Sequence, residues 1–152
     1  MKRLLLFTML LLATLPMMAE LTAKEREFRS QVQSHIRYEG YTPSIDSDGS
    51  IEFKYQGKTY WVDVTEYKNG FYVDIYTGIV IEDDQYAAAI IAANKSTREY
   101  KFLRAYLTSS NEAVYIKMGG YFMSISQFKD VFNSWLNVVS DERIAIYNSI
   151  ND

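Results

Sequence analysis

The stretch that decides the fold is residues 51–75, IEFKYQGKTYWVDVTEYKNGFYVDI. Apolar and polar side chains alternate through it with the period of two that a β-strand has when one of its faces is buried. Two short breaks divide the stretch, Gln56-Gly57 and Asn69-Gly70, and Asn-Gly is the strongest two-residue signal for a hairpin turn. The pattern predicts three consecutive antiparallel strands over residues 50–55, 58–67 and 71–80.

Each predicted turn fixes which residues lie opposite one another across its hairpin. Around the first turn Ile51 lies opposite Val62, and around the second turn Val64 lies opposite Ile75. The two registers agree, because both place the same aliphatic side chains on one face of the sheet. We expect that face to receive the helices; its members are Ile51, Phe53, Val62, Val64, Phe71, Val73 and Ile75.

Helices and a second hairpin are predicted around these strands. Apolar spacing indicates a helix over residues 21–38, a second from Asp83 or Asp84 to residue 94, and a long final helix that begins at a capping box of Ser124 and Gln127. Residues 100–107 and 112–118 alternate as two more strands, and Gly119-Gly120 is expected to end their hairpin. The predicted fold class is α+β: a five-stranded antiparallel sheet with helices on one face, in the order α-β-β-β-α-β-β-α.

The opposite face of the predicted sheet carries aromatic rings and charges in alternation. Its size exceeds what single exposed aromatics need, which favours a docking surface for a polypeptide, for a second copy of the chain or for a sugar. The other interpretation is that tyrosine is simply a favourable residue on an open strand. The candidate interaction residues are Trp61, Asp63, Tyr72, Asp74, Tyr76, Phe102, Arg104, Tyr106 and Tyr115, and Thr65, Tyr67 and Lys117 share the face.

Composition excludes several kinds of chemistry. The chain has no cysteine and a single histidine, so disulfides, thiolate metal sites and multi-histidine metal sites are impossible. An EF-hand loop with Gly49 at its sixth position would begin at Ser44 and end at Tyr55, where acidic ligands belong, so residues 46–49 are interpreted as a turn. We expect no metal and no cofactor. His35, near the end of the first helix, is interpreted as a helix C-terminal cation or a partly buried packing residue.

Asp63 and Asp74 are the residues that could carry catalysis. The predicted register places them diagonally on adjacent strands, about 7–8 Å apart, within the range used by inverting glycosidases. A flat sheet face, however, does not enclose a general acid as that chemistry requires. Solvated acids are therefore favoured, and we expect the protein not to be an enzyme.

The first residues predict an export signal. Lys2 and Arg3 precede an apolar run over residues 4–15, and a small residue, Ala19, follows at the expected cleavage position. The run is shorter than the roughly 20 residues of a membrane span, although an uncleaved N-terminal anchor is the alternative. The expected products are a signal peptide over residues 1–19 and a single α+β domain over residues 20–152, exported to the periplasm or released. Without Lys2 and Arg3 the charge is 14 − 19 = −5, which opposes binding to nucleic acid.

Two phrases carry a family resemblance. They are Gly40-Tyr41 followed by residues 45–54, IDSDGSIEFK, and residues 87–94, AAAIIAAN, before a pair of strands. Over about residues 25–147 the chain resembles the type III secretion chaperone-like superfamily, including the YbjN-type proteins labelled bacterial sensory transduction regulators. The resemblance implies a five-stranded antiparallel sheet against helices, no catalytic residues, and in the secretion chaperones a dimer that holds extended client segments. The export signal departs from those chaperones, which work in the cytosol.

The functional expectation combines these observations. We expect an exported, non-enzymatic protein-interaction module, chaperone-like or adaptor, whose partner is a protein or a second copy, bound through the aromatic sheet face. The alternative is a carbohydrate-binding module on the same face, with rings stacked on sugars and Asp63, Asp74 or Arg104 bonding hydroxyls.

Overall fold

The computed structural model describes residues 21–152, so the export signal expected over residues 1–19 lies outside the described residues. The elements follow one another as α2 (Ala23–Tyr38), β1 (Ser44–Ile45), β2 (Ile51–Tyr55), β3 (Lys58–Tyr67), β4 (Gly70–Val80), the 3-10 turn η2 (Asp83–Gln85), α3 (Tyr86–Glu99), β5 (Leu103–Leu107), β6 (Ala113–Phe122) and α4 (Ile125–Asn151). Among residues 21–152, no helix is both long enough and apolar enough to cross a membrane.

All strands belong to one antiparallel sheet with the order β1-β2-β3-β4-β6-β5. The α+β class is confirmed, but the sheet has six strands where five were predicted. The additional strand is β1, which pairs Ser44 with Glu52 and Ile45 with Ile51. A strand of two residues carries no alternation, so periodicity could not reveal it.

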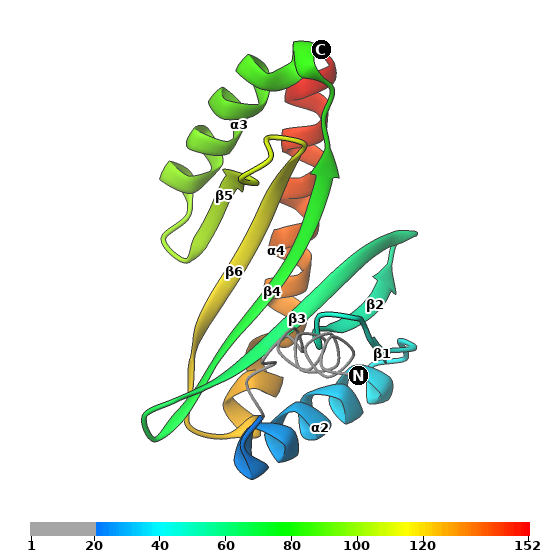
Figure 1. Cartoon of the computed structure of the whole chain (residues 1–152), viewed down its shortest axis with the longest axis vertical. Helices are drawn as coiled ribbons and strands as arrows, with labels where there is room; N and C mark the ends of the chain where they lie inside the picture. Colours follow the sequence, from blue (N-terminus) through cyan, green and yellow to red (C-terminus); the bar gives the residue numbers. More distant parts are fainter. Residues whose placement is uncertain (1–20) are drawn as a thin grey trace, which may run out of the picture.

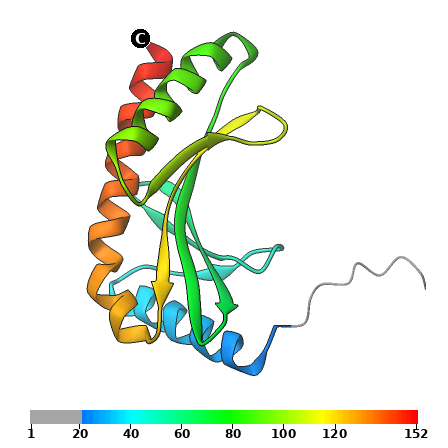
Figure 2. The same ribbon diagram turned by 90° about the vertical axis from the view of Figure 1, so that its left-hand side faces the viewer.

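The helices lie on one side of the sheet. α4 runs along the back of β4 and β6, α2 crosses at one end and α3 covers β5 (Figure 1), and the side view shows the three helices and the sheet as two layers (Figure 2). The aliphatic sheet face meets Phe128, Phe132, Leu136 and Val139 of α4 in a buried core. The predicted inward residues are buried or nearly so, and the predicted capping glutamine, Gln127, accepts from the backbone N–H of Ser124 at 3.3 Å.

The register of the first hairpin is confirmed, and that of the second is wrong by two residues. Ile51 lies opposite Val62 as predicted, but Val64 lies opposite Val73 rather than Ile75. The turn residues are Lys68 and Asn69, with Lys68 at φ +55°, and Gly70 already belongs to β4. Gly70 lies opposite Tyr67, and a Cβ there would lie 2.6 Å from the carbonyl oxygen of Phe122, so this strand position requires glycine. A shift of two residues leaves every side chain on its predicted face.

The boundaries between α3 and β6 also differ from the predictions. Glu82, not Asp83 or Asp84, caps η2, and its N–H donates to the side chain of Gln85 at 3.0 Å. The helix continues to Glu99, so β5 starts at Leu103, and β6 continues through Gly119-Gly120 to Phe122. Gly120 lies opposite Val73, and a Cβ there would lie 2.7 Å from the ring of Trp135, so this strand position requires glycine.

Helix side chains satisfy some of the unpaired backbone groups of β5 and β3. At the β5 edge, Thr97 Oγ1 accepts from Ala105 N–H at 2.9 Å and donates to Ala105 C=O at 3.1 Å. At the other side, beyond the end of β2, Arg29 donates to Val64 C=O at 2.9 Å and Glu25 accepts from Glu66 N–H at 3.3 Å. Such unpaired backbone groups would otherwise recruit a further strand, so both places are protected against edge-to-edge pairing.

Candidate interaction surface

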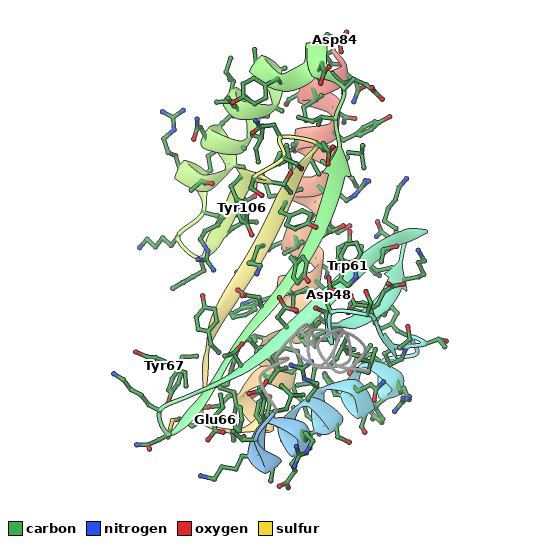
Figure 3. All side chains as sticks on the ribbon, in the orientation of Figure 1. Asp48, Trp61, Glu66, Tyr67, Asp84 and Tyr106 are labelled. Atoms are coloured by element: carbon green, nitrogen blue, oxygen red, sulfur yellow. The ribbon has the colours of Figure 1, made fainter. Side chains whose placement is uncertain are left out.

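The sheet side opposite the helices, which we call the outer face, gathers side chains from four strands. Its members are Trp61, Asp63, Thr65 and Tyr67 of β3, Tyr72, Asp74 and Tyr76 of β4, Arg104 and Tyr106 of β5, and Tyr115, Lys117 and Tyr121 of β6. No helix of residues 21–152 covers this face in the two ribbon views (Figures 1 and 2). Figure 3 shows Trp61, Tyr67 and Tyr106 distributed along its length.

Sequence reasoning found most of this face but not all of it. Tyr121 was missed because the strand was expected to end before Gly119. The alternation Tyr115, Lys117, Gly119, Tyr121 was the available signal. Phe102 was predicted within a strand but lies in the bend before β5, where it is exposed.

Asp63 and Asp74 lie directly opposite each other, not diagonally as predicted, because of the shifted register. Two like charges in this relation are destabilising unless a cation lies between them. Lys117 provides it: its Nζ is 3.1 Å from Asp74 Oδ2 and 3.8 Å from Asp63 Oδ2, and 4.7 Å from the centre of the Tyr76 ring. Arg104 Nη2 is 3.4 Å from Asp74 Oδ1 and donates to Tyr72 Oη at 3.3 Å. We call Asp63, Asp74, Lys117 and Arg104 the charge cluster.

Gly119 makes room for the buried member of the charge cluster. It lies opposite Asp74 on β6, and a Cβ at this position would overlap Asp74 Oδ1. The missing side chain lets the Asp74 carboxylate lie close to the sheet, where the residue is only 8% exposed. A buried carboxylate is tolerated when charged donors satisfy it, as Lys117 and Arg104 do here.

The rings of the outer face contact one another as well as solvent. Trp61 stacks on Tyr76 with 5.6 Å between ring centres and 19° between planes, and Tyr115 lies 5.8 Å from Tyr76 and 6.2 Å from Tyr106. Burial raises the pKa of the Tyr76 phenol above its ordinary value of 10.0, so this group stays protonated. Tyr67, Tyr106 and Tyr121 remain exposed.

A hollow of about 410 Å³ adjoins the Trp61–Tyr76 pair. It lies between α2, the turn before β2 and β3, and its lining combines carboxylates, one guanidinium and hydroxyls: Glu25, Arg29, Asp48, Ser50, Asp63, Thr65 and Tyr76. Ser50 donates to Asp63 Oδ1 at 2.5 Å. The turn prediction for residues 46–49 is confirmed, since Asp46 Oδ1 accepts from the backbone N–H groups of Asp48 and Ser50 at 3.0 and 2.9 Å.

His35 is a packing residue of the core. Its ring meets Phe132 and Phe128 edge-on, at 5.2 and 6.2 Å between centres, and only 6% of its side chain is exposed. Burial lowers the pKa of His35 below 6.5. The carboxylate of Glu39, 3.7 Å away, raises this pKa by a smaller amount, and the positive charge of Lys129 lowers it further. The imidazole is therefore neutral at pH 7, which supports the packing interpretation.

Both carboxylates of the charge cluster have partners within the chain. Each carboxylate of the charge cluster already accepts hydrogen bonds or an ion pair, from Ser50 and Tyr76 at Asp63 and from Lys117 and Arg104 at Asp74. Among residues 21–152, no three His, Asp or Glu side chains converge in a way that could hold a metal ion. The rings, by contrast, present apolar area of the kind that protein interfaces use.

Comparisons with known proteins agree on the fold. No family model matches the chain, and no curated protein does. The structure is similar to the crystal structure of an uncharacterised protein from Methanothermobacter thermautotrophicus, with a TM-score of 0.57 and 13% identity over 82% of this chain and 96% of that one. It is also similar to the crystal structure of YbjN from E. coli, with a TM-score of 0.49 and 9% identity over 80% and 87% of the two chains. At 13% identity, the similarity to the archaeal protein concerns the fold alone.

Proposed function

We propose that this chain is a non-enzymatic protein-interaction module whose outer face binds a polypeptide. The observation that carries the proposal is that the three helices cover one face of the sheet and leave the other, with its exposed rings, to solvent. Exposed aromatic rings gathered on one face and bordered by charged groups are a feature of protein interaction sites. Tyr and Trp are the residues that most often dominate the binding energy of an interface.

The sheet edges support the face as the binding surface. Thr97 satisfies the backbone of β5, and Glu25 and Arg29 satisfy that of β3, so a partner strand finds no free ladder in these places. At these places strand addition is blocked, which favours binding across the outer face through side chains.

The test compares baits that differ only in where rings are removed. Trp61→Ser with Tyr106→Ser removes two rings of the outer face, whereas Tyr38→Ser with Tyr147→Ser removes two exposed rings from α2 and α4. We expect the first pair to lower partner capture by about tenfold or more and the second to leave it unchanged, with both variants folded by circular dichroism. Equal recovery of the same partners by wild type and the outer-face variant would refute the proposal.

A second candidate function, carbohydrate binding, is favoured by the polar hollow beside the Trp61–Tyr76 pair. Its volume lies within the range of small-ligand sites, and aromatic faces next to hydroxyl and carboxylate groups suit a sugar ring. A glycan array separates the candidates, because a module that binds only polypeptides gives no signal there.

Export belongs to the proposal as well. Its support is the basic start and the apolar run of residues 2–15 followed by Ala19. Mass spectrometry of the protein recovered from its native cells tests it: export with cleavage gives a chain that begins at Glu20, whereas an uncleaved anchor or a cytosolic protein keeps residues 1–19.

A further inference from the structure

The helices form a groove of their own, away from the outer face. α2 crosses close to the start of α4 in both ribbon views (Figures 1 and 2). Two hollows, of about 470 and 320 Å³, lie between these helices, and each has a volume within the range of small-ligand sites. The hollows share Gln31 and Ile125, so they form one continuous depression, which we call the helix groove.

The larger hollow is lined by groups that can donate hydrogen bonds and by one cation. Among residues 21–152 no carboxylate lines it, and its polar side chains are Ser30, Gln31, Ser34, His35, Tyr38 and Lys129. Ile125, the first residue of α4, also lines it, so the positive end of that helix dipole lies at the same place. The hollow beside the Trp61–Tyr76 pair, by contrast, is lined by three carboxylates. The larger hollow of the helix groove therefore favours an anionic group.

His35 gives an independent reason to expect a ligand in the larger hollow. The residue is only 7% exposed, and its Nε2 atom is buried without a hydrogen-bond partner among the described residues. Glu39 Oε1 is 3.7 Å away, beyond hydrogen-bond distance, and Oε2 of the same carboxylate accepts from Asn133 Nδ2 at 2.8 Å. A buried polar atom without a partner costs free energy, and in a native structure it indicates a partner that is not part of the chain. Because His35 lines the larger hollow, a polar group bound there lies beside the imidazole.

The smaller hollow offers apolar area. Phe28 and Phe71 stack in its lining with 4.0 Å between ring centres, and Met123, which also lines it, is 57% exposed. Lys24 and Glu27 line it as well, and their charges cancel. The helix groove therefore joins an apolar end to an end that attracts a negative charge.

We infer that the helix groove binds a monocarboxylic acid with an apolar chain. The carboxylate pairs with Lys129 and accepts from the hydroxyls of Ser30 and Ser34, while the chain lies over Ile125 and on the rings of the smaller hollow. An inorganic anion would leave the apolar end uncovered, and an uncharged sugar would leave the cation unpaired. The inference goes beyond the proposed function, since it concerns a surface built by the helices and not the outer face.

Calorimetric titration of the purified protein with octanoate and with octanol tests the inference. The two ligands share their chain and differ in charge, so the ratio of their dissociation constants measures what the cation contributes. We expect the wild type to bind octanoate about tenfold or more tightly than octanol, and Lys129→Gln to bind the two alike. Lys129 is exposed, so its substitution leaves the core intact. Lys101→Gln, in the exposed bend between α3 and β5, is the matched control and should keep the preference. Met123→Ser should weaken both ligands by a similar factor, because it removes only apolar contact.

The single histidine supplies a second measurement, by nuclear magnetic resonance. In the protein without an affinity tag the imidazole proton signals belong to His35 alone. Octanoate should shift them over the same concentrations that produce heat. Heat of binding without that shift would overturn the inference, because the ligand would then lie elsewhere. Equal affinity of the folded wild type for the two ligands, a preference that survives Lys129→Gln, or no binding of octanoate would overturn it too. Partner capture by the Trp61 and Tyr106 variant tests the outer face separately, so the proposed function stands or fails on its own.

Discussion

Gly119 provides the sharpest test of how the outer face is built. A Cβ at this position would overlap Asp74 Oδ1 and lie 3.0 Å from Asp74 Cγ and from Tyr72 Oη. In Gly119→Ala the carboxylate must therefore move away from Lys117 and Arg104, now 3.1 and 3.4 Å away. Overpacking costs about 1–3 kcal/mol and a weakened charged hydrogen bond about 1.5–3 kcal/mol, while replacing a strand glycine returns about 0.5–1 kcal/mol. We expect a net loss of about 2–4 kcal/mol in the free energy of unfolding.

The sign should reverse when Asp74 is already absent. In an Asp74→Ala background the remaining close contact is Tyr72 Oη, the far end of a side chain that can move. Gly119→Ala should then stabilise the protein by about 0.5–1 kcal/mol, because only the backbone entropy term remains. Gly78→Ala is the matched control on the same sheet, since its Cβ would lie 3.0 Å from the ring of Tyr115 and near no carboxylate.

Urea denaturation followed by tryptophan fluorescence measures these changes. With a slope of about 2 kcal/mol per molar urea, the expected loss in Gly119→Ala moves the midpoint by about 1–2 M. If Gly119→Ala destabilises the protein equally with and without Asp74, the carboxylate is not what the glycine accommodates. The pairing of Asp74 with Gly119 would then be wrong.

Three further outcomes are expected. As the pH falls from neutrality through 6.5, the free energy of unfolding of the wild type should decrease, because burial lowers the pKa of His35 and the unfolded chain therefore binds the proton first. In His35→Leu the free energy of unfolding, measured by denaturant titration, should change less over that pH range. An equal dependence on pH in the two proteins would contradict this. Thr97→Val should lower the free energy of unfolding, measured by thermal denaturation, by about 1–2 kcal/mol, because the backbone N–H and C=O of Ala105 both lose their partner. The exposed backbone should also increase light scattering at high protein concentration. Thr97→Ser keeps the hydroxyl and should have neither effect. Lys117→Met should lower the free energy of unfolding by about 2–4 kcal/mol, because it leaves Asp63 facing Asp74 without a cation between them. Adding Asp63→Asn should restore part of that loss, and a loss that the second substitution does not change would argue against the bridging role of Lys117.

The faces of the sheet were predictable from the sequence, whereas the ends of its strands were not. Alternation determines which side a residue takes, and a shift of two, as between Val64 and Val73, does not alter it. Strand ends depend on contacts with distant segments. Asn69-Gly70 looks like a turn, yet Gly70 belongs to β4, where its missing side chain leaves room for Phe122 of β6.

The candidate site shows the same division. Its rings and charges could be collected from the alternation, but their pairing could not, because it depends on the register across β3, β4 and β6. Asp63 thus came to face Asp74, with Lys117 between them. The gap above Gly119 that admits Asp74 has no local sequence signal, since the neighbour that fills it comes from another strand.

The recessed position of Asp74 and Lys117 has a consequence for how the protein should respond to ionic strength. Counter-ions screen charges that water reaches, and they reach Asp63 and Arg104 far more readily than the shielded pair. Added salt should therefore weaken any binding that depends on Asp63 and Arg104, while it barely changes the stability of the folded chain. A salt titration would therefore distinguish the charges that support partner binding from those that support folding stability, without any substitution.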